Sequence, residues 1–337
     1  MEHPSGACER SPRGAPSRAR LYGLLAVMLG IWAANFIFAK VAVRTAPPVL
    51  VACLRTVLSG LLMIPVYRVV SRRHLDPVLR PFTLRDVPRM ALVGVLGIVG
   101  NQFAFVLALS TTSVAHGAIV GATSPVLVLI GAAALGREKL RVRKVLGMLA
   151  SVAGVAVLQF GRVPSGNSSP VGDAVMLGNA ALFAGFSLLG KPLLEEVGSL
   201  AVNAVAYWGG ALLALPYAVV GLVRVGPAQL GLAAWAGVLY MAVAPSIVGY
   251  LIYAHALRYL PSSRVASVTY LQPVLATLLA VALLGERPGL GYAFGALVIL
   301  GGVWLVQSPS APRRTVPLSP PQALPHRPLT RADGPGP

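Results

Sequence analysis

Two stretches of the sequence carry nearly the same pattern: SPVLVLIGAAALGREK at positions 124–139 and QPVLATLLAVALLGER at positions 272–287. Each has a polar residue, then Pro-Val-Leu, and then an apolar run that closes with Gly, Glu and Arg. Pro125 and Pro273 lie 148 positions apart, and so do Glu138 and Glu286. The chain therefore contains an internal repeat, with one copy in each half.

The composition indicates that the repeat lies in a membrane. Hydrophobic residues make up 56% of the 337 residues and charged residues only 11%, against about 25% charged in an ordinary soluble domain. Apolar runs of about 20 residues, long enough to cross a bilayer as a helix, recur along the chain. We predict ten such spans, at 21–43, 48–69, 90–110, 114–135, 142–160, 172–191, 200–223, 231–257, 263–284 and 289–307.

The spacing of further matches predicts how the spans are arranged. Gly147 matches Gly295 at the same offset of 148, and Lys40 matches Lys191 at an offset of 151. Each half then holds five spans, and because five is odd the second copy begins on the opposite side of the membrane. We therefore predict an all-α integral membrane protein with ten transmembrane helices in two inverted five-helix repeats. Repeats of this kind build transporters whose substrate site lies between the halves.

The basic residues predict the orientation. Of the 28 lysines and arginines, 22 fall on one side of the predicted spans, five fall on the other, and Arg55 lies within the second span. Because positive loops stay in the cytoplasm, we expect a multi-pass protein of the cell membrane with both termini cytoplasmic. The net charge of +18 then suits anionic lipid headgroups, and no nucleic-acid partner is expected. The Pro- and Arg-rich tails, 1–20 and 308–337, are predicted to be disordered.

Three stretches carry a family resemblance: GIWAANFIFAKVA (30–42), GDAVMLGNAALFAGFSLLGK (172–191) and VASVTYLQPVLATLLAVALLGERPGLGYAFGALVILGGVWLV (265–306). The chain resembles the EamA family of the drug/metabolite transporter superfamily, with one repeat at 21–161 and a second at 171–307. The resemblance implies an exporter or permease for amino acids, related small metabolites or drugs. It also implies a central cavity lined mainly by helices one, three, four, six, eight and nine.

Polar and aromatic side chains inside the spans are the candidates for that cavity. Polar groups are costly in hydrocarbon, so they face a cavity or bond to one another, and for any single residue both interpretations stay open. Several candidates occupy matched positions, since Gln102 pairs with Tyr250 and Ser124 with Gln272 at the offset of 148. The predicted substrate-binding residues are Trp32, Asn35, Asn101, Gln102, Ser124, Tyr250, Tyr270 and Gln272. This mixture suits a small, partly apolar zwitterion or amide.

Other functions remain as alternatives. The sequence has no GxSxG, HExxH or phosphate-loop motif and no Cys or His cluster, so we expect neither an enzyme nor a metal or cofactor site. A membrane enzyme or a channel is the alternative from another class. A drug transporter, or one for nucleotide-linked or phosphorylated sugars, is the alternative within transport, although phosphates favour several inward cations and Arg55 is the only one.

Two further features have a structural interpretation. Small residues recur on one face of the fifth span (Gly147, Ser151, Gly154) and of the tenth (Gly291, Gly295, Gly302), which predicts close packing within the chain or a homodimer interface. All ten acidic residues fall in tails, loops or helix ends. Glu138 and Glu286 are expected to cap helices there, and no carboxylate is predicted to carry protons through the membrane.

Overall fold

The computed structural model describes residues 16–73, 79–81, 83–112, 114–159, 169–275, 278–279 and 290–308. Almost all of the two predicted disordered tails lies outside these residues, as does Glu286. The helix around His116 is described, but its side chain is not.

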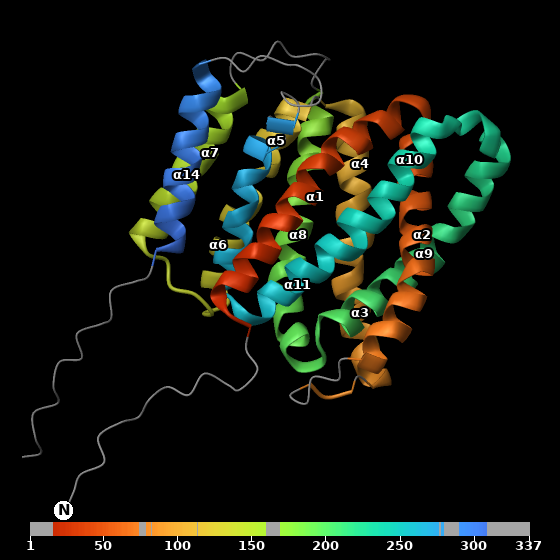
Figure 1. The fold of residues 1–337 in the computed structure, drawn as a ribbon, viewed down its shortest axis with the longest axis horizontal. Helices are drawn as coiled ribbons and strands as arrows, with labels where there is room; N and C mark the ends of the chain where they lie inside the picture. Colours follow the sequence, from red (N-terminus) through yellow and green to blue (C-terminus); the bar gives the residue numbers. More distant parts are fainter. Residues whose placement is uncertain are drawn as a thin grey trace, which may run out of the picture. The chain divides into compact units, whose positions relative to one another are not determined.

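The described residues form helices and no strand (Figure 1). Four helices run for more than 25 residues without a break: α1 (Arg18–Thr45), α2 (Pro48–Arg73), α8 (Pro170–Val197) and α9 (Ser199–Val225). Two further long rods each join three segments: α3 (Val87–Gly94), η2 (Val95–Gly100) and α4 (Asn101–Thr111), and then α10 (Gly231–Met241), η4 (Ala242–Gly249) and α11 (Tyr250–Tyr259). The remaining segments are η1 (Leu84–Asp86), α5 (Val114–Gly121), α6 (Ser124–Ala134), α7 (Val142–Gln159), η3 (Pro227–Leu230), α12 (Ser262–Ser267), η5 (Val268–Leu271) and α14 (Leu290–Gln307).

Six of these helical stretches are long and apolar enough to cross a membrane, and two further apolar helices are shorter. Large hydrophobic side chains lie on the outside, such as Leu212, Val223 and Trp304, each with more than 60% of its surface exposed. Exposed apolar surface on this scale needs a lipid surrounding, because water would penalise it. The predicted all-helical membrane protein is confirmed. The count of ten spans and the inversion of the repeats stay predictions.

Local signals explain where the first helix of each half begins. Ser17 accepts a hydrogen bond from the backbone N–H of Arg20, 3.2 Å away, and so caps α1. Ser169 caps α8 in the same way, with Val171 as donor at 3.2 Å and Pro170 as the first helical residue. Gly198 separates α8 from α9 at a φ of 87°, a conformation that favours glycine.

The two long rods share an unusual feature at matched positions. Their middle segments, η2 and η4, are π-helices, in which the chain is wound more widely than in an α-helix. Val95–Gly100 shifted by the repeat offset of 148 falls at 243–248, within Ala242–Gly249. Segments of this kind are rare and occur frequently at functional sites, because they displace carbonyl groups from the regular ladder.

Two pairs of helices that occupy the same place in the two halves pack on each other (Figure 1). The fifth helices, α7 and α14, contact each other through the small residues noted in the sequence. A Cβ on Gly147 would lie 2.7 Å from the Gly302 carbonyl oxygen, and one on Gly154 would lie 2.9 Å from that of Gly295. The predicted close packing within the chain is confirmed. The second helices, α2 and α9, also pack on each other.

The first helix of each half carries a lysine that caps the third helix of the same half. Lys40 Nζ donates to carbonyl oxygens at the end of α4, and Lys191 Nζ donates to those at the end of α11. Cations stabilise helix C-termini, where carbonyl groups lack partners. The acceptors are Leu109 (2.9 Å) and Thr112 (3.5 Å) in the first half and Leu257 and Leu260 (3.0 Å) in the second, which match at the offset of 148.

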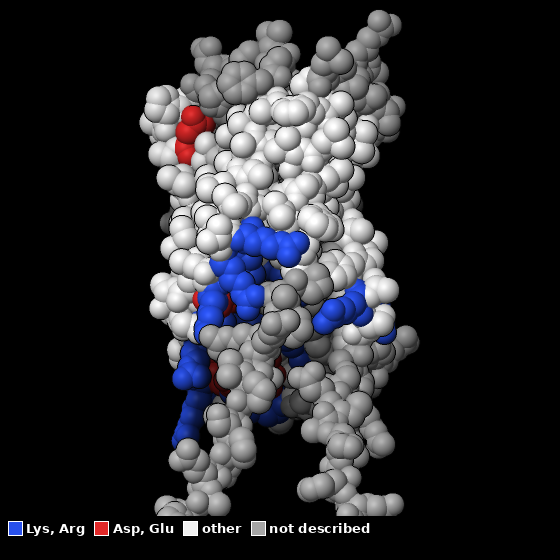
Figure 2. Space-filling view, turned by 90° about the vertical axis from the view of Figure 1, so that its left-hand side faces the viewer, with Lys and Arg blue, Asp and Glu red and all other residues white. Residues whose placement is uncertain are grey.

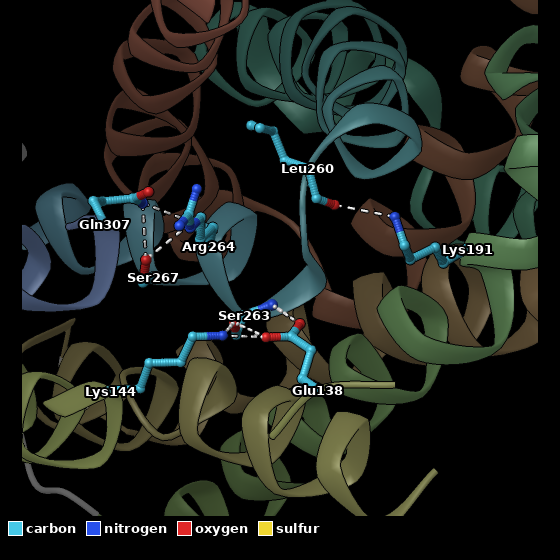
Figure 3. A network of polar contacts seen from close by, with 8 residues as sticks. All are labelled: Glu138, Lys144, Lys191, Leu260, Ser263, Arg264, Ser267 and Gln307. Carbon is cyan, nitrogen blue, oxygen red and sulfur yellow. Dashed lines mark hydrogen bonds and ion pairs between the residues drawn. The ribbon is translucent and has the colours of Figure 1, made fainter. Parts of the chain in front are cut away.

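A polar network ties the two halves together at one end of the bundle (Figure 3). Glu138, in the connection from α6 to α7, accepts hydrogen bonds from the Ser263 backbone N–H (3.0 Å), the Ser263 hydroxyl and Lys144. Glu138 therefore caps a helix as predicted, but the helix is α12 of the second half rather than α7, which follows it in the chain. Beside it, Gln307 Nε2 donates to the Arg264 carbonyl (2.9 Å) and to Ser267 Oγ (3.1 Å).

Basic side chains gather toward this end. On the face drawn in Figure 2, lysines and arginines lie in the lower part, and the upper part of the described surface shows none. Tyr22, near the start of α1, donates to Gln307 Oε1, near the end of α14, at 2.9 Å. The first and last described helices therefore meet at the basic end.

Candidate functional site

One cavity of about 140 Å³ lies between the helices, several times the volume of a water molecule, about 30 Å³. All eight residues predicted from the sequence line it: Trp32, Asn35, Asn101, Gln102, Ser124, Tyr250, Tyr270 and Gln272. The structure thus brings the whole set together, from α1, α4, α6, α11, η5 and the helical residues after η5. That these side chains contact a substrate stays a prediction.

The cavity has an aromatic wall centred on Trp32. Its ring lies 5.9 Å from that of Phe183 and 5.7 Å from that of Tyr250, centroid to centroid, and Tyr253 lies behind at 5.5 Å. Gly249 allows this packing, because a Cβ there would lie 2.4 Å from Trp32 Nε1. Phe183 stands 151 positions after Trp32, the offset of the early part of the repeats. The two halves therefore contribute matched aromatic rings to one wall.

The carbonyl groups of the two π-helices hold two of these side chains. Tyr250 donates its hydroxyl to the Gly97 carbonyl oxygen of η2 at 2.6 Å. Trp32 donates Nε1 to the Pro245 carbonyl oxygen of η4 at 3.3 Å. Gly97 and Pro245 are 148 positions apart, so each half offers the same carbonyl to an aromatic residue of the other half. Both rods are wound as π-helices at the level of these two contacts.

Asn101 joins the halves by a second route. Its side-chain amide donates to the Asn179 carbonyl oxygen on α8, and the Asn179 amide donates to the Asn101 carbonyl oxygen in return. The remaining side-chain oxygen of Asn101 lies 2.7 Å from the Tyr250 hydroxyl and shares its single proton with the Gly97 carbonyl oxygen. Both functional groups of Asn101 are therefore used, and its orientation is determined.

Gln102 belongs to a buried network that includes a cation. Gln102 Nε2 donates to the Tyr207 hydroxyl at 2.9 Å, and Tyr207 donates to the Ser246 carbonyl oxygen at 2.5 Å. Ser246 Oγ also accepts from Arg55 Nε at 2.9 Å. The network joins α2 and α4 of the first half to α9 and η4 of the second, and Arg55 lines the cavity.

Two other lining residues have polar atoms without a hydrogen-bond partner among the described residues. These are the side-chain oxygen of Asn35 and the hydroxyl of Tyr270, and both residues are buried. Buried polar atoms in folded proteins are bonded in about nine cases out of ten. Both atoms therefore lack the partner that most buried polar atoms have, although their residues line the cavity.

The sequence reasoning missed part of the lining. Arg55 stands out in the sequence only as an isolated charge in a span, and Asn179 is not among the predicted residues. Phe183 could have been found from Trp32 by the repeat offset. The other additional lining residues are Phe36, Phe105, Gly117, Gly121, Ala122, Met176, Pro245, Thr269 and Pro273.

Acidic residues do not line the cavity in the described part of the chain. Glu138 lies in the network at the basic end, and Asp173 accepts from Thr112 Oγ1 at 2.7 Å near the start of α8. His255 stacks edge-on against Tyr259, with ring centroids 5.0 Å apart, and does not line the cavity either. Among the described residues no cluster of His, Cys, Asp and Glu could hold a metal ion.

The two-fold pattern of contacts around one cavity has a counterpart in known proteins. The sequence profile of the EamA-like transporter family matches residues 19–160 and 170–308, once in each half. The chain belongs to this family. The resemblance found in the sequence is confirmed, and the protein is a multi-pass membrane transporter.

Individual relatives of this EamA-like transporter cover most of its length. An uncharacterized transporter of Archaeoglobus fulgidus is 29% identical over 285 residues, 84% of this chain and 95% of that one. A probable amino-acid metabolite efflux pump of Escherichia coli K12 is 27% identical over 304 residues, 85% of this chain and 95% of that one. A solved crystal structure aligns with a TM-score of 0.70 over 86% of this chain and 97% of that one, at 21% identity, which shows a shared fold alone.

Proposed function

We propose that this EamA-like transporter moves amino acids or related small metabolites across the cell membrane by alternating access. The observation that carries the proposal is the cavity itself. Amide, hydroxyl and aromatic side chains from both halves surround it, and several occupy equivalent positions in the two repeats. Such a wall binds a small, partly apolar molecule with a few polar groups. The name of the Escherichia coli relative points to the same class of substrate.

The proposal includes ten spans in two inverted repeats. Two observations support the inversion. Lys40, near the end of α1, bonds to Leu109 at the end of α4, and Asp173, near the start of α8, bonds to Thr112 three residues later. The end of the first helix of one repeat therefore lies beside the start of the first helix of the other. Repeats of opposite direction give one chain two related states, each open to one side.

The proposal places both termini in the cytoplasm, at the basic end where Tyr22 meets Gln307. Glu138, Lys144 and Ser263 would then join the halves on the cytoplasmic side. No described carboxylate lines the cavity, so the simplest mechanism is movement down the gradient of the substrate rather than exchange with protons at an acidic group.

Counterflow into proteoliposomes tests the proposal. Vesicles containing the purified protein are loaded with one candidate and diluted into a trace amount of the same labelled compound, across amino acids, nucleobases and cationic drugs. We expect saturable accumulation of one or more amino acids, absent from protein-free vesicles. Selective ion currents from folded protein, with no counterflow of any candidate, would show a channel and contradict the proposal.

A further inference from the structure

Arg55 is a buried cation in the cavity wall, and no carboxylate in the described part of the chain pairs with it. It lies on α2 with 3% of its surface exposed, and the described acidic residues form no ion pair with it. A charge buried in a protein interior is costly unless an opposite charge or several hydrogen bonds compensate it. The cavity is therefore deficient in negative charge, and an anionic group entering it would supply the missing partner.

The hydrogen bonds of Arg55 leave most of the guanidinium group free. Nε donates to Ser246 Oγ at 2.9 Å, which fixes the side chain against η4 of the second half. The two terminal nitrogens have no hydrogen-bond partner among the described residues. Guanidinium presents its donors in a planar fork that matches the two oxygens of a carboxylate. Thus Nε orients the side chain of Arg55, and its two terminal nitrogens are free to donate hydrogen bonds to a ligand.

A second group in the same cavity requires a donor. The side-chain oxygen of Asn35 has no partner, although the residue has only 7% of its surface exposed. The hydroxyl of Tyr270, a residue 1% exposed, has none either and can donate or accept. A protonated amino group carries the N–H donors that both atoms can accept. Trp32, Phe183 and Phe105 line the rest of the cavity and suit an apolar side chain.

We propose that Arg55 binds the carboxylate of the substrate, and that Asn35 and Tyr270 accept hydrogen bonds from its amino group. The substrate class is therefore the zwitterionic amino acids, with the carboxylate as the required group. This inference rests on the proposed function and makes it more specific: esters, amides and decarboxylated amines of the same side chain are excluded. One cation suits one carboxylate, whereas a phosphate or diphosphate would leave negative charge without a partner.

The first test compares analogues on the unaltered protein, so that folding of a variant is not in question. Whichever amino acid counterflows is set in competition with its own amide, which lacks the negative charge, and with its decarboxylated amine. We expect both to compete at least about 30-fold more weakly, the loss typical when one partner of a buried charged hydrogen bond is removed. Equal competition by the acid and its amide would overturn the inference while leaving the proposed transport intact.

The second test separates charge from structure. Arg55→Gln should reduce binding of the acid strongly and of the amide little, so the ratio between them falls toward one. Ser246→Ala is the matched control, because it removes the tether of Arg55 and retains the cation; the preference for the acid should persist. If Arg55 were only structural, acid and amide would weaken together in Arg55→Gln and the ratio would stay unchanged, which contradicts the inference.

The two proposals fail in distinguishable ways. Counterflow of amines or neutral nucleobases, with none of amino acids, would refute the role of Arg55 and the substrate class but leave a metabolite transporter. Absence of counterflow by every compound, with ion currents, would refute both. Thermal unfolding of each purified variant establishes that the protein is folded before its transport is compared.

Discussion

Asn101 on α4 and Asn179 on α8 hold each other by reciprocal hydrogen bonds. The side-chain amide of each donates to the backbone carbonyl oxygen of the other, at 3.1 Å from Asn101 and 2.6 Å from Asn179. The pair joins the third helix of the first repeat to the first helix of the second, at the wall of the cavity. Two hydrogen bonds that each end on a backbone carbonyl group fix the distance between the helices more tightly than a single contact between two flexible side chains.

Replacing Asn179 by Ala should therefore lower stability and transport together. The change removes the hydrogen bond that the Asn179 side-chain amide donates to the Asn101 carbonyl oxygen, and we expect a loss of about 1–3 kcal/mol in the free energy of unfolding. Thermal unfolding and counterflow measure the two effects. Asn203→Ala is the matched control, because Asn203 is also buried but its amide bonds only within its own helix, to Ser199. A loss as large in the control would show that the interhelical pair is not special.

Tyr250→Phe should weaken transport while the protein stays folded. The ring and its packing on Trp32 are retained, but the hydroxyl bonds to Gly97 and Asn101 are lost. A net loss of about 1 to 1.5 kcal/mol corresponds to a transport rate lower by about tenfold. Tyr217→Phe, on the exposed surface of α9, controls for the loss of a hydroxyl. Unchanged transport by Tyr250→Phe would show that the hydroxyl of Tyr250 has no role in the site.

The lysine caps should behave as a matched pair. Lys40→Met and Lys191→Met each remove a cation from the carbonyl groups at the end of a neighbouring helix. We expect each to destabilise the protein by about 1–2 kcal/mol, measured by thermal unfolding. Lys139→Met, at an exposed position, should have little effect. A clear effect of only one of the two variants would mean that the contacts are not equivalent.

The network around Glu138 predicts a dependence of stability on pH. Burial alone would raise the pKa of Glu138, but the hydrogen bonds from Lys144 and Ser263 outweigh it and hold the pKa below its usual 4.5. A carboxyl group whose pKa is lowered by folding stabilises the protein fully above its unfolded pKa, and this stabilisation is lost as the pH falls through the folded value.

Glu138→Gln should accordingly be less stable than the parent at about pH 7, by roughly 1–3 kcal/mol, and the difference should shrink below about pH 4.5. Thermal unfolding across pH provides the measurement. Glu195→Gln is the control, since the ion pair of Glu195 with Lys191 is exposed and contributes little. A difference that stays constant down to about pH 3 would argue against an ionised Glu138 in the network.

The orientation can be tested by labelling single cysteines with an impermeant thiol reagent in intact cells. In a background of Cys8→Ser and Cys53→Ala, Gln229→Cys should react from outside, since it is exposed in η3 between α9 and α10. Arg85→Cys, exposed in η1 within the predicted cytoplasmic loop 71–89, should react only after lysis. The reverse pattern would invert the topology.

The sequence by itself determined the membrane environment, the positions of the main helices and the existence of two repeats. These properties are written locally: apolar length determines whether a helix can span, and a repeated pattern such as Pro-Val-Leu at 125 and 273 needs no coordinates to be recognised. The residues that line the cavity could also be predicted from the sequence, because a polar residue such as Gln102 inside an apolar span is costly unless it faces a cavity or bonds to another polar group.

Only the tertiary structure decided which groups meet. Arg55 was visible as a charge, but its place in the cavity depends on how α2 packs beside η4, and Ser246 lies 191 positions away. Glu138 was expected to cap a helix, yet the neighbour that it caps belongs to the other repeat. The π-helices have no distinct signal in the sequence. Their carbonyl groups accept hydrogen bonds from Trp32 and Tyr250, which belong to the opposite half, so these contacts depend on how the halves pack. Apolar pattern determines that a helix forms, whereas the packing of two halves determines which of its atoms are left free to bind.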